Sequence, residues 1–460
     1  MFLSSIRRTC ALCLKTYPKY STKPKVALDE NVLNDITNLV FKPRRHPGVS
    51  KTRTVHIPES FVKAVLNVME DYPVKSLVEA SLDLQKHLKL KIPPMEEQDI
   101  KEATRLAHQK VLFKHKQVPI KDENDEHRFR QMVNNKVSNI LRCKINNWKA
   151  VKYDAFLSLV YLIGRSAAEY SVLTKIFGDI ADRDPEFNPR SLFDFGSGVG
   201  TVTWAASRYW KKYIFEYFHV DISRDMNDLA ELLLKGGRKT APISLKGVFF
   251  RQFLPASSAS YDLVVSAYSL LELPSTSARL ETVLNLWNKT HQYLVIIEQG
   301  TTAGFKVVNE ARDFILHIKK EGNKGHIFSP CPHDNVCPKY VLSDGTPCNF
   351  EVNYVSMPVG ASSSTRKELY SYVVLKKGER NANDVEWPRI VKPVLVKPRH
   401  TICRMCVPDG KLQEVIFTKA RHGKTTYHCA RSSKWGDLLP ITLSCNDEEK
   451  DTESIDVSKE

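Results

Sequence analysis

Ser191-Leu-Phe-Asp-Phe-Gly-Ser-Gly-Val-Gly200 joins a short apolar run to a helical pattern that begins near Thr201. Glycines at such a strand-to-helix turn let backbone amides approach a bound nucleotide and permit positive φ angles. The next predicted strand ends at Val220-Asp221, and Asp221 lies 21 residues beyond Gly200. A carboxylate there can accept hydrogen bonds from ribose hydroxyls. Strand, loop, helix and acid together predict a nucleotide-cofactor site.

The first residue of the glycine loop favours one kind of cofactor. Asp194 would repel the pyrophosphate of a dinucleotide, which such loops hold. A carboxylate suits the cationic amino-acid part of S-adenosylmethionine instead. An empty, vestigial nucleotide site is the alternative that the motif leaves open. The predicted cofactor-binding residues are Asp194, Gly196, Ser197, Gly198, Gly200 and Asp221.

Alternating strands and helices around this motif predict an α/β domain with a doubly wound parallel sheet, a Rossmann-like core. The apolar runs 261–266 and 293–298 are typical of central parallel strands. Helices are predicted at 225–235, where Gly236-Gly237 ends the pattern, and at 304–320. Two further strands would close the sheet, and they are predicted at 350–357 and 368–377.

The N-terminal part carries two different signals. Residues 1–28 hold six basic residues and no acidic one, which is typical of a mitochondrial transit peptide. Residues 29–60 are basic and rich in turn-forming residues, so we expect an irregular N-terminal extension. Helical periodicity then predicts an α-helical domain that completes the region 29–185, with a section rich in Lys and Arg at 120–150.

Ten cysteines in 460 residues are too few for a disulfide scaffold, and their clustering favours a metal site. Five of them crowd the last third of the chain: Cys331, Cys337, Cys348, Cys403 and Cys406. The spacing departs from the two close pairs of most structural zinc sites, and proline follows Cys331 and Cys337, as it follows a ligand in some ferredoxins. The residues leave an iron–sulfur cluster, a zinc ion and no metal open. His333 could be a further ligand, but we expect it to be a surface imidazole.

Three of these cysteines lie in a predicted insertion, 329–350, within the nucleotide-binding domain 186–385. The region 386–445 predicts a small β module that completes the metal site, with a barrel as one arrangement. Its predicted strands lie at 391–396, 412–418 and 425–429. Residues 446–460 carry seven acids and two bases, which predicts a disordered tail.

The net charge of +16 points to a polyanionic partner, and RNA is the usual one. A role in solubility is the alternative. No apolar run approaches the roughly 18 residues that a membrane span needs, so the sequence predicts none.

No catalytic residue can be assigned. Methylation of base amino groups often uses an Asn/Asp-Pro-Pro-aromatic turn after the fourth strand, where this chain has Ser266-Ala-Tyr-Ser269. Methylation of cytosine C5 needs a thiolate, and no cysteine occurs between Cys143 and Cys331. Tyr268, Glu272 and Glu298 could face the cofactor, but we expect them to be buried structural residues.

Several longer segments together resemble a known family, the methyltransferase-like assembly factors of the mitochondrial small ribosomal subunit. The resemblance spans roughly 40–440. The segments that carry it are Tyr153…Tyr161-Leu-Ile-Gly-Arg165, Pro189-Arg-Ser-Leu-Phe-Asp-Phe-Gly-Ser-Gly198, Tyr268-Ser-Leu-Leu-Glu-Leu-Pro274, Glu298-Gln-Gly-Thr-Thr-Ala-Gly-Phe305, the two Cys-Pro pairs, and Arg431…Trp435-Gly-Asp437-Leu.

The resemblance implies a class I methyltransferase fold that binds S-adenosylmethionine and a [4Fe–4S] cluster. It maps the cluster ligands to Cys331, Cys337, Cys348 and Cys406, with Cys403 as a rival for the fourth position. It also implies a mitochondrial matrix protein, expected as a monomer on the ribosome, that binds immature small-subunit rRNA near the mRNA channel. Turnover is doubtful in this family. An active rRNA methyltransferase and an iron–sulfur sensor that gates translation are the alternative functions.

Overall fold

The computed structural model describes residues 24–51, 54–115, 122–146, 148–255, 259–318, 323–360, 362–381 and 384–444. The predicted transit peptide up to residue 23 and the predicted acidic tail at 446–460 lie outside these residues. Within the described part, no helix has both the length and the apolar character needed to cross a membrane.

The described residues form a central nine-stranded sheet in the order β2-β9-β10-β7-β6-β3-β4-β5, with β8 also paired to β10. The strands are β2 (Thr54–Val55), β3 (Ser191–Phe195), β4 (Glu216–Val220), β5 (Val248–Arg251), β6 (Tyr261–Ala267), β7 (Thr290–Gln299), β8 (Gly325–Ser329), β9 (Phe350–Val355) and β10 (Thr365–Lys377).

The sheet is mixed, and the prediction of a parallel sheet is wrong at one edge. Strands β5, β4, β3, β6 and β7 run parallel, whereas β10 is antiparallel to β7, β8 and β9. A short connection joins β9 to β10, and consecutive strands joined in this way form an antiparallel hairpin because a parallel pair needs a long crossover. This strand order, with the antiparallel β10 inserted beside β7, is that of a methyltransferase-like α/β fold.

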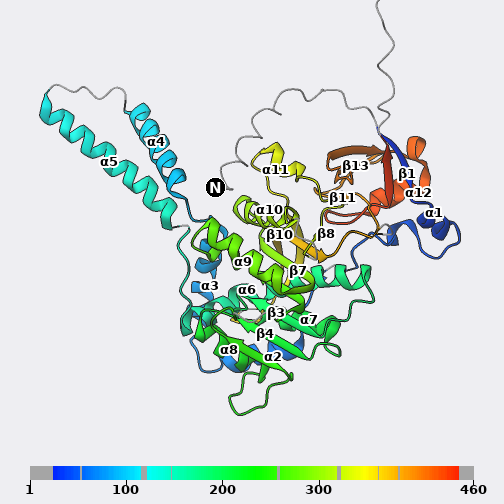
Figure 1. The fold of residues 1–460 in the computed structure, drawn as a ribbon, viewed down its shortest axis with the longest axis horizontal. Coiled ribbons are helices and arrows are strands. Elements are labelled where there is room, and N and C mark those ends of the chain that lie inside the picture. Colours follow the sequence, from blue (N-terminus) through cyan, green and yellow to red (C-terminus); the bar gives the residue numbers. More distant parts are fainter. Residues whose placement is uncertain are drawn as a thin grey trace, which may run out of the picture.

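Helices cover both faces of the sheet (Figure 1). Successive side chains of the central strands point to opposite faces of the sheet and pack into two separate cores. Leu192 of β3 packs into one core and Phe193 into the other. One face carries α6 (Ala155–Arg183) and α7 (Thr201–Trp210), and the other carries α9 (Thr276–Lys289) and α10 (Thr302–Leu316). A third core joins α8 (Arg224–Leu234) to the N-terminal helices α2 (Glu59–Met69) and α3 (Val74–Lys89).

The strands at 191–194, 261–266 and 293–298 and the helix that Gly236 and Gly237 end are confirmed. Strands β5 and β8 and helix α9 were not predicted.

The segment 29–60 is more regular than predicted. It contains α1 (Glu30–Thr37), and the Asp29 side chain caps this helix by accepting a 3.1 Å hydrogen bond from the Val32 amide. Just before it, β1 (Lys25–Leu28) pairs with β15 (Ile441–Ser444). The last residues of the predicted transit peptide therefore form a strand of the folded protein.

A helical hairpin projects from the body of the molecule (Figure 1). It consists of α4 (Glu97–Lys114) and α5 (Glu123–Asn146). A small core holds the two helices together, formed by Ala107, Val111, Val133 and Val137. This hairpin, hereafter the arm, extends the α-helical region that the sequence predicts.

The C-terminal region contains a separate four-stranded sheet and a helix. The elements are β11 (Arg389–Ile390), β12 (Leu395–Val396), β13 (Thr401–Cys406), β14 (Leu412–Phe417) and α12 (Lys419–Ser432). The strand predicted at 425–429 is wrong, because these residues lie in α12 after a break at Gly423. Buried Thr426, Tyr427 and Ala430 recur at helical spacing. Five residues are too few to distinguish this spacing from the alternation of a strand.

Candidate functional site

A cavity of about 400 Å³ lies at the carboxyl ends of the parallel strands. Its lining includes Gly196 after β3, Asp221 after β4, Tyr268 after β6 and Glu298 at the end of β7. Strand β4 lies on one side of β3 and β6 on the other, and open α/β sheets bind ligands in the crevice at such a switch point. The volume is that of a small-molecule site.

The loop between β3 and α7 needs glycine at two positions on the cavity wall. Gly196 has a φ of +68°, and a Cβ there would lie 2.4 Å from the Cβ of Ser269. Gly198 has a φ of +50°, and its amide donates a 2.9 Å hydrogen bond to Oδ2 of Asp221. Positive φ angles and close approach both exclude a side chain, so backbone geometry explains the motif.

Asp221 is held by the backbone of two loops. Besides the Gly198 amide, the Ser223 amide donates a 2.8 Å hydrogen bond to Oδ1. Burial raises the pKa of Asp221, and the two amides oppose that increase. Each carboxylate oxygen can accept more than one hydrogen bond, so the group keeps acceptor capacity toward the cavity.

The structure brings only part of the predicted cofactor set to the cavity. The lining includes Gly196, Gly198 and Asp221. It does not include Asp194, Ser197 and Gly200. Asp194 is fully buried, with Oδ2 3.5 Å from Nδ1 of His219. Strand alternation turns Asp194 to the same face as Leu192, so a direct contact with the amino group of a cofactor does not fit this placement.

Two unsatisfied polar groups face the cavity. The sequence named Tyr268 as a residue that could face the cofactor, but it did not single out Arg165. Tyr268 has a φ of +58°, and its buried hydroxyl has no hydrogen-bond partner among the described residues. Arg165 of α6 lies 5.1 Å from the Tyr268 ring centroid. Its Nη2 atom also lacks a partner in the described part of the chain. Because buried polar groups are nearly always satisfied, these atoms are suited to contact a bound molecule.

Glu298 is a buried acid in the cavity wall. Its Oε1 atom accepts hydrogen bonds from the amides of Leu270 and Leu271, at 2.8 and 3.2 Å. Burial is the main cause that raises the pKa of Glu298 to about 8, and the nearby Glu272 adds to the effect. The carboxyl group is therefore protonated in the folded protein at neutral pH.

The protonation of Glu298 makes stability depend on pH. An acid whose pKa is higher in the folded than in the unfolded chain lowers the free energy of unfolding as pH rises between the two pKa values, here from 4.5 to about 8. We expect the Glu298→Gln variant to gain in melting temperature relative to the wild type across this window. Melting curves at a series of pH values measure the difference. The exposed Glu281→Gln variant should show none, and a constant offset for Glu298→Gln would contradict the prediction.

Glu272 links the cavity to both roots of the arm. Lys91, which precedes α4, forms an ion pair with Oε1 of Glu272. The Val151 amide, which follows α5, donates a 3.1 Å hydrogen bond to Oε2 of the same carboxylate. Lys91, Val151 and Glu272 all line the cavity. One side chain therefore holds the entry and the exit of the arm at the rim of the cavity.

A second cavity, of about 330 Å³, is lined by four thiols from three parts of the chain. They belong to Cys331 and Cys337 before α11 (Pro338–Leu342), to Cys348 before β9, and to Cys406 at the end of β13. The structure thus brings together all four predicted metal-ligating cysteines, which are separated by up to 75 positions in the sequence.

Cys403 and Cys406 point in opposite directions although they form a close pair in the sequence. Both belong to β13, where residues three apart face opposite sides of the sheet. Cys403 is fully buried in the apolar core beneath α12, whereas Cys406 lines the thiol cavity. Strand β13 was not predicted, so the sequence could not separate the two.

His333 lies beside the thiols, and the expectation of a surface imidazole is wrong. The ring is 4% exposed, and its Nε2 atom lies 3.2 Å from Sγ of Cys406. Burial, followed by the charge of Arg312, lowers the pKa of His333 to about 4. The imidazole is therefore neutral at physiological pH and can hydrogen-bond a sulfur.

The thiols are strongly biased toward the protonated form when no cation is near. Burial raises the pKa of Cys337 to about 11, and the Cys331 thiol adds to the shift. Burial and the three other thiols raise the pKa of Cys406 well above its usual value. Across the described residues, no three Cys, His, Asp or Glu side chains are grouped closely enough to hold one metal ion.

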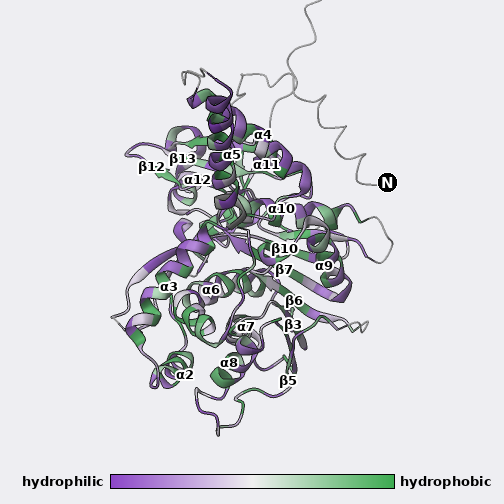
Figure 2. Ribbon diagram, turned by 90° about the vertical axis from the view of Figure 1, so that its left-hand side faces the viewer, coloured by the Kyte–Doolittle hydropathy of each residue, from purple (hydrophilic) through white to green (hydrophobic). Residues whose placement is uncertain are grey.

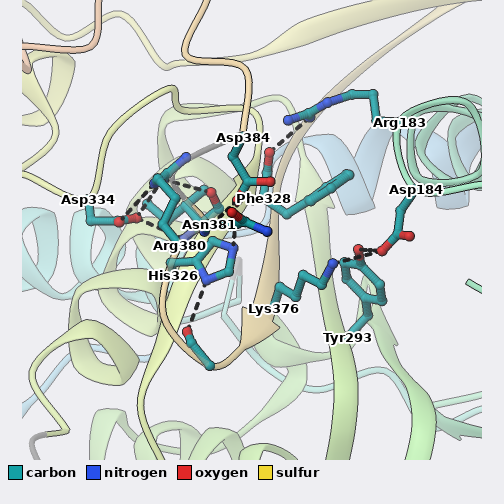
Figure 3. Close-up of polar contacts among 12 residues, drawn as sticks. Arg183, Asp184, Tyr293, His326, Phe328, Asp334, Lys376, Arg380, Asn381 and Asp384 are labelled. Carbon is teal, nitrogen blue, oxygen red and sulfur yellow. Dashed lines mark hydrogen bonds and ion pairs between the residues drawn. The ribbon is translucent and has the colours of Figure 1, made fainter. Parts of the chain in front are cut away.

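Polar contacts anchor the loop that carries the first two cysteines (Figure 3). Oδ1 of Asp334 accepts hydrogen bonds from the Ile327 amide at 2.8 Å and from Nη2 of Arg380 at 3.0 Å. Strand β8, which precedes this loop, is itself tied to α6, because Nη1 of Arg183 donates a 2.9 Å hydrogen bond to the Phe328 carbonyl. The loop is thereby fixed to the core of the protein.

Comparison with solved structures finds methyltransferases. A SAM-dependent methyltransferase from Aquifex aeolicus is 18% identical, with a TM-score of 0.26, and the match covers 33% of this chain and 75% of that one. The magnesium protoporphyrin IX methyltransferase of Synechocystis, solved with bound SAH, is 14% identical, with a TM-score of 0.29, and the match covers 50% of this chain and 90% of that one.

Comparison of sequences finds closer relatives. The human mitochondrial ribosome assembly protein METTL17 is 36% identical over 403 residues, which are 86% of each chain. The mitochondrial ribosome assembly protein RSM22 of Saccharomyces cerevisiae is 22% identical over 289 residues, 41% of this chain and 45% of the yeast protein. The family model described as mitochondrial small ribosomal subunit Rsm22 matches residues 155–440. This protein is a member of the Rsm22 family.

Proposed function

We propose that this protein assists assembly of the mitochondrial small ribosomal subunit in the matrix. In this role it binds the immature subunit and its rRNA near the mRNA channel, as a monomer, and it carries S-adenosylmethionine and a [4Fe–4S] cluster. Membership of the Rsm22 family and the names of its human and yeast relatives support the assembly role. The net charge of +16 supports an RNA partner.

The first cavity supports S-adenosylmethionine as the ligand. Asp221 offers acceptors for ribose hydroxyls at the end of β4. The unsatisfied Nη2 atom of Arg165 suits the carboxylate of the amino-acid part, and the Tyr268 hydroxyl can donate to the same group. Bound S-adenosylmethionine would supply an electrophilic methyl group.

The surroundings of this cavity favour binding without turnover, and this is the observation that carries the proposal. The turn after β6 offers no Asn or Asp, and its Ser266 and Ser269 hydroxyls hydrogen-bond each other at 2.7 Å. Segments outside the sheet also contribute Lys91, Ala150 and Val151 to the lining. The roots of the arm thus form part of the cavity wall.

The second cavity supports a polynuclear cluster over a single ion. A zinc ion needs four ligands about 2.1–2.3 Å from one centre, whereas a [4Fe–4S] cluster occupies the space between four thiolates. The chain offers four thiols around a cavity, and Arg312 lies near enough to two of them for their charge to raise the pKa of its guanidinium. The donor set and the nearby cation fit the net negative charge of such a cluster.

An active rRNA methyltransferase is the second candidate. Glu298 favours it, because a carboxyl group with a pKa of about 8 can exchange a proton near neutral pH. Its Oε1 atom is nevertheless engaged by two backbone amides.

Sedimentation of mitochondrial lysate tests the assembly role. We expect the full-length protein to migrate with immature small-subunit particles and to be absent from complete ribosomes, because an assembly protein leaves before translation begins. Equal association with complete ribosomes would contradict the proposal. Incubation of the purified protein with rRNA and S-adenosylmethionine separates the two candidates. Methylation of a defined base that is lost in the Asp221→Ala variant would establish the enzyme.

A further inference from the structure

The outer face of the arm has an unusual composition along α5. Arg128, Gln131, Asn135, Ser138 and Arg142 recur at intervals of three and four residues and are all exposed. At 3.6 residues per turn they form one stripe, opposite the buried Val133 and Val137. From Arg128 to Arg142 the stripe is about 21 Å long. We call these five residues the α5 stripe.

The α5 stripe is free of carboxylates. No Asp or Glu occurs from 127 to 142, while Arg130 and Lys136 flank the stripe. Among the described residues, Arg128 and Arg142 form no ion pair. Of the four bases of this section, Arg130 pairs with Glu126 at 2.6 Å. Figure 2 shows α5 as one of the most hydrophilic parts of the protein.

Helix α4 differs, although it belongs to the same arm. Two of its four bases are neutralised within the helix, because Lys101 pairs with Glu97 at 2.6 Å and Arg105 pairs with Glu102 at 2.6 Å. Helix α5 has five bases and three acids, whereas α4 has four bases and three acids. The exposed but paired Lys101 and Arg105 of α4 therefore provide an internal comparison with Arg128 and Arg142 of α5.

We propose that the α5 stripe docks along the sugar–phosphate surface of double-stranded RNA. The proposal rests on the small-subunit assembly role and names the RNA surface that the arm would contact. Guanidinium groups at both ends of the stripe fit phosphates, and the Gln, Asn and Ser side chains between them can exchange hydrogen bonds with 2′-hydroxyls. The minor groove of A-form RNA is wide and shallow and presents these groups to a helix.

The chemistry of the stripe fits RNA better than a protein partner. Stable protein interfaces have an apolar centre with aromatic or aliphatic anchors, and the stripe offers none. Among the described residues, the exposed large apolar side chains of the arm all lie on α4, and they are Ile100, Leu106, Leu112 and Phe113. Most contacts of nucleic-acid-binding proteins go to phosphate and sugar, from the residue types that the stripe contains.

The test compares two double variants of the full-length protein. Arg128→Gln/Arg142→Gln changes the stripe, and Lys101→Gln/Arg105→Gln removes the same charge from α4. Binding is measured by fluorescence anisotropy with an RNA hairpin whose stem has about 16 base pairs, over a series of salt concentrations. A DNA duplex of the same sequence tests the role of the 2′-hydroxyls. Circular dichroism confirms that each variant is folded.

We expect the stripe variant to lose about tenfold in affinity for the RNA stem, and the slope of log Kd against log salt to fall by about two. The α4 variant should stay close to the wild type, and the wild type should prefer RNA to DNA. Equal losses in both variants, or none in either, would overturn the proposal.

A further measurement separates this inference from the assembly role. If the stripe variant binds RNA like the wild type but no longer sediments with immature subunits, the stripe contacts a ribosomal protein and the RNA proposal is wrong. If the wild type itself does not sediment with immature subunits, the assembly role is wrong, whatever the result of the RNA-binding measurement.

Discussion

Replacement of Cys406 by serine is expected to abolish cluster binding. The thiols line one cavity but come from the loop 331–337, from Cys348 and from β13, so a bound cluster would join the core domain to the C-terminal sheet. Binding free energy of a structural metal site is folding free energy, on the order of 10 kcal/mol where it has been measured for zinc. Iron analysis and visible absorbance of anaerobically purified protein measure the loss, from about four irons per chain to nearly none. A lower melting temperature should accompany it.

Cys403 provides the matched control, only three residues away. The Cys403→Ser variant buries a hydroxyl in the apolar core beneath α12, so it should lose stability while it keeps its iron. Loss of iron in Cys403→Ser with retention in Cys406→Ser would reverse the ligand assignment. One zinc per chain and no visible absorbance in the wild type would show that the site binds zinc and that the cluster assignment is wrong.

Replacement of Asp221 by alanine should have the second largest effect, on binding of S-adenosylmethionine. Hydrogen bonds to a charged acceptor contribute about 1.5–3 kcal/mol each, so loss of the ribose contacts should weaken binding at least roughly tenfold. Titration calorimetry with the purified protein measures the affinity. The variant also removes the acceptor of the Gly198 and Ser223 amides, and Asp221→Asn keeps part of that support.

Asp228 of α8 is the control for this prediction. Its side chain is exposed, pairs with Arg224 at 3.5 Å and does not line the cavity. The Asp228→Ala variant should bind S-adenosylmethionine like the wild type. If Asp221→Ala also binds it normally, the ligand does not contact the end of β4, and the proposed cofactor site is wrong.

The glycine loop and the acid of β4 could be predicted because both reflect local rules. Gly196 and Gly198 occupy backbone conformations that only glycine adopts without strain. Asp221 follows its strand at the spacing that places it beside that loop. Local patterns also predicted the apolar central strands, since burial on both faces leaves a continuous apolar run.

Other features depend on contacts between distant segments and left no such pattern. The short strand β13 has cysteines on both of its faces, so no alternation marks it and the pair looks like one site. The inserted antiparallel β10 follows from pairing with β7, and the starts of the two strands are 75 positions apart in the sequence. Arg165 and Tyr268 meet only in the folded chain, and the positive φ of Tyr268 has no signature in its sequence.

The carboxylate of Glu272 makes the cavity and the arm parts of one mechanical system. A ligand that displaced the Glu272 carboxylate from Lys91 or Val151 would release a root of the arm from the cavity wall. Helix α5 has 24 residues and is about 36 Å long, so a turn of roughly ten degrees at its root displaces its tip by about 6 Å. By thermodynamic reciprocity, a ribosomal surface that fixes the arm changes the affinity for the ligand by the same factor. The arm would then couple the affinity for the cofactor to the affinity for the ribosome.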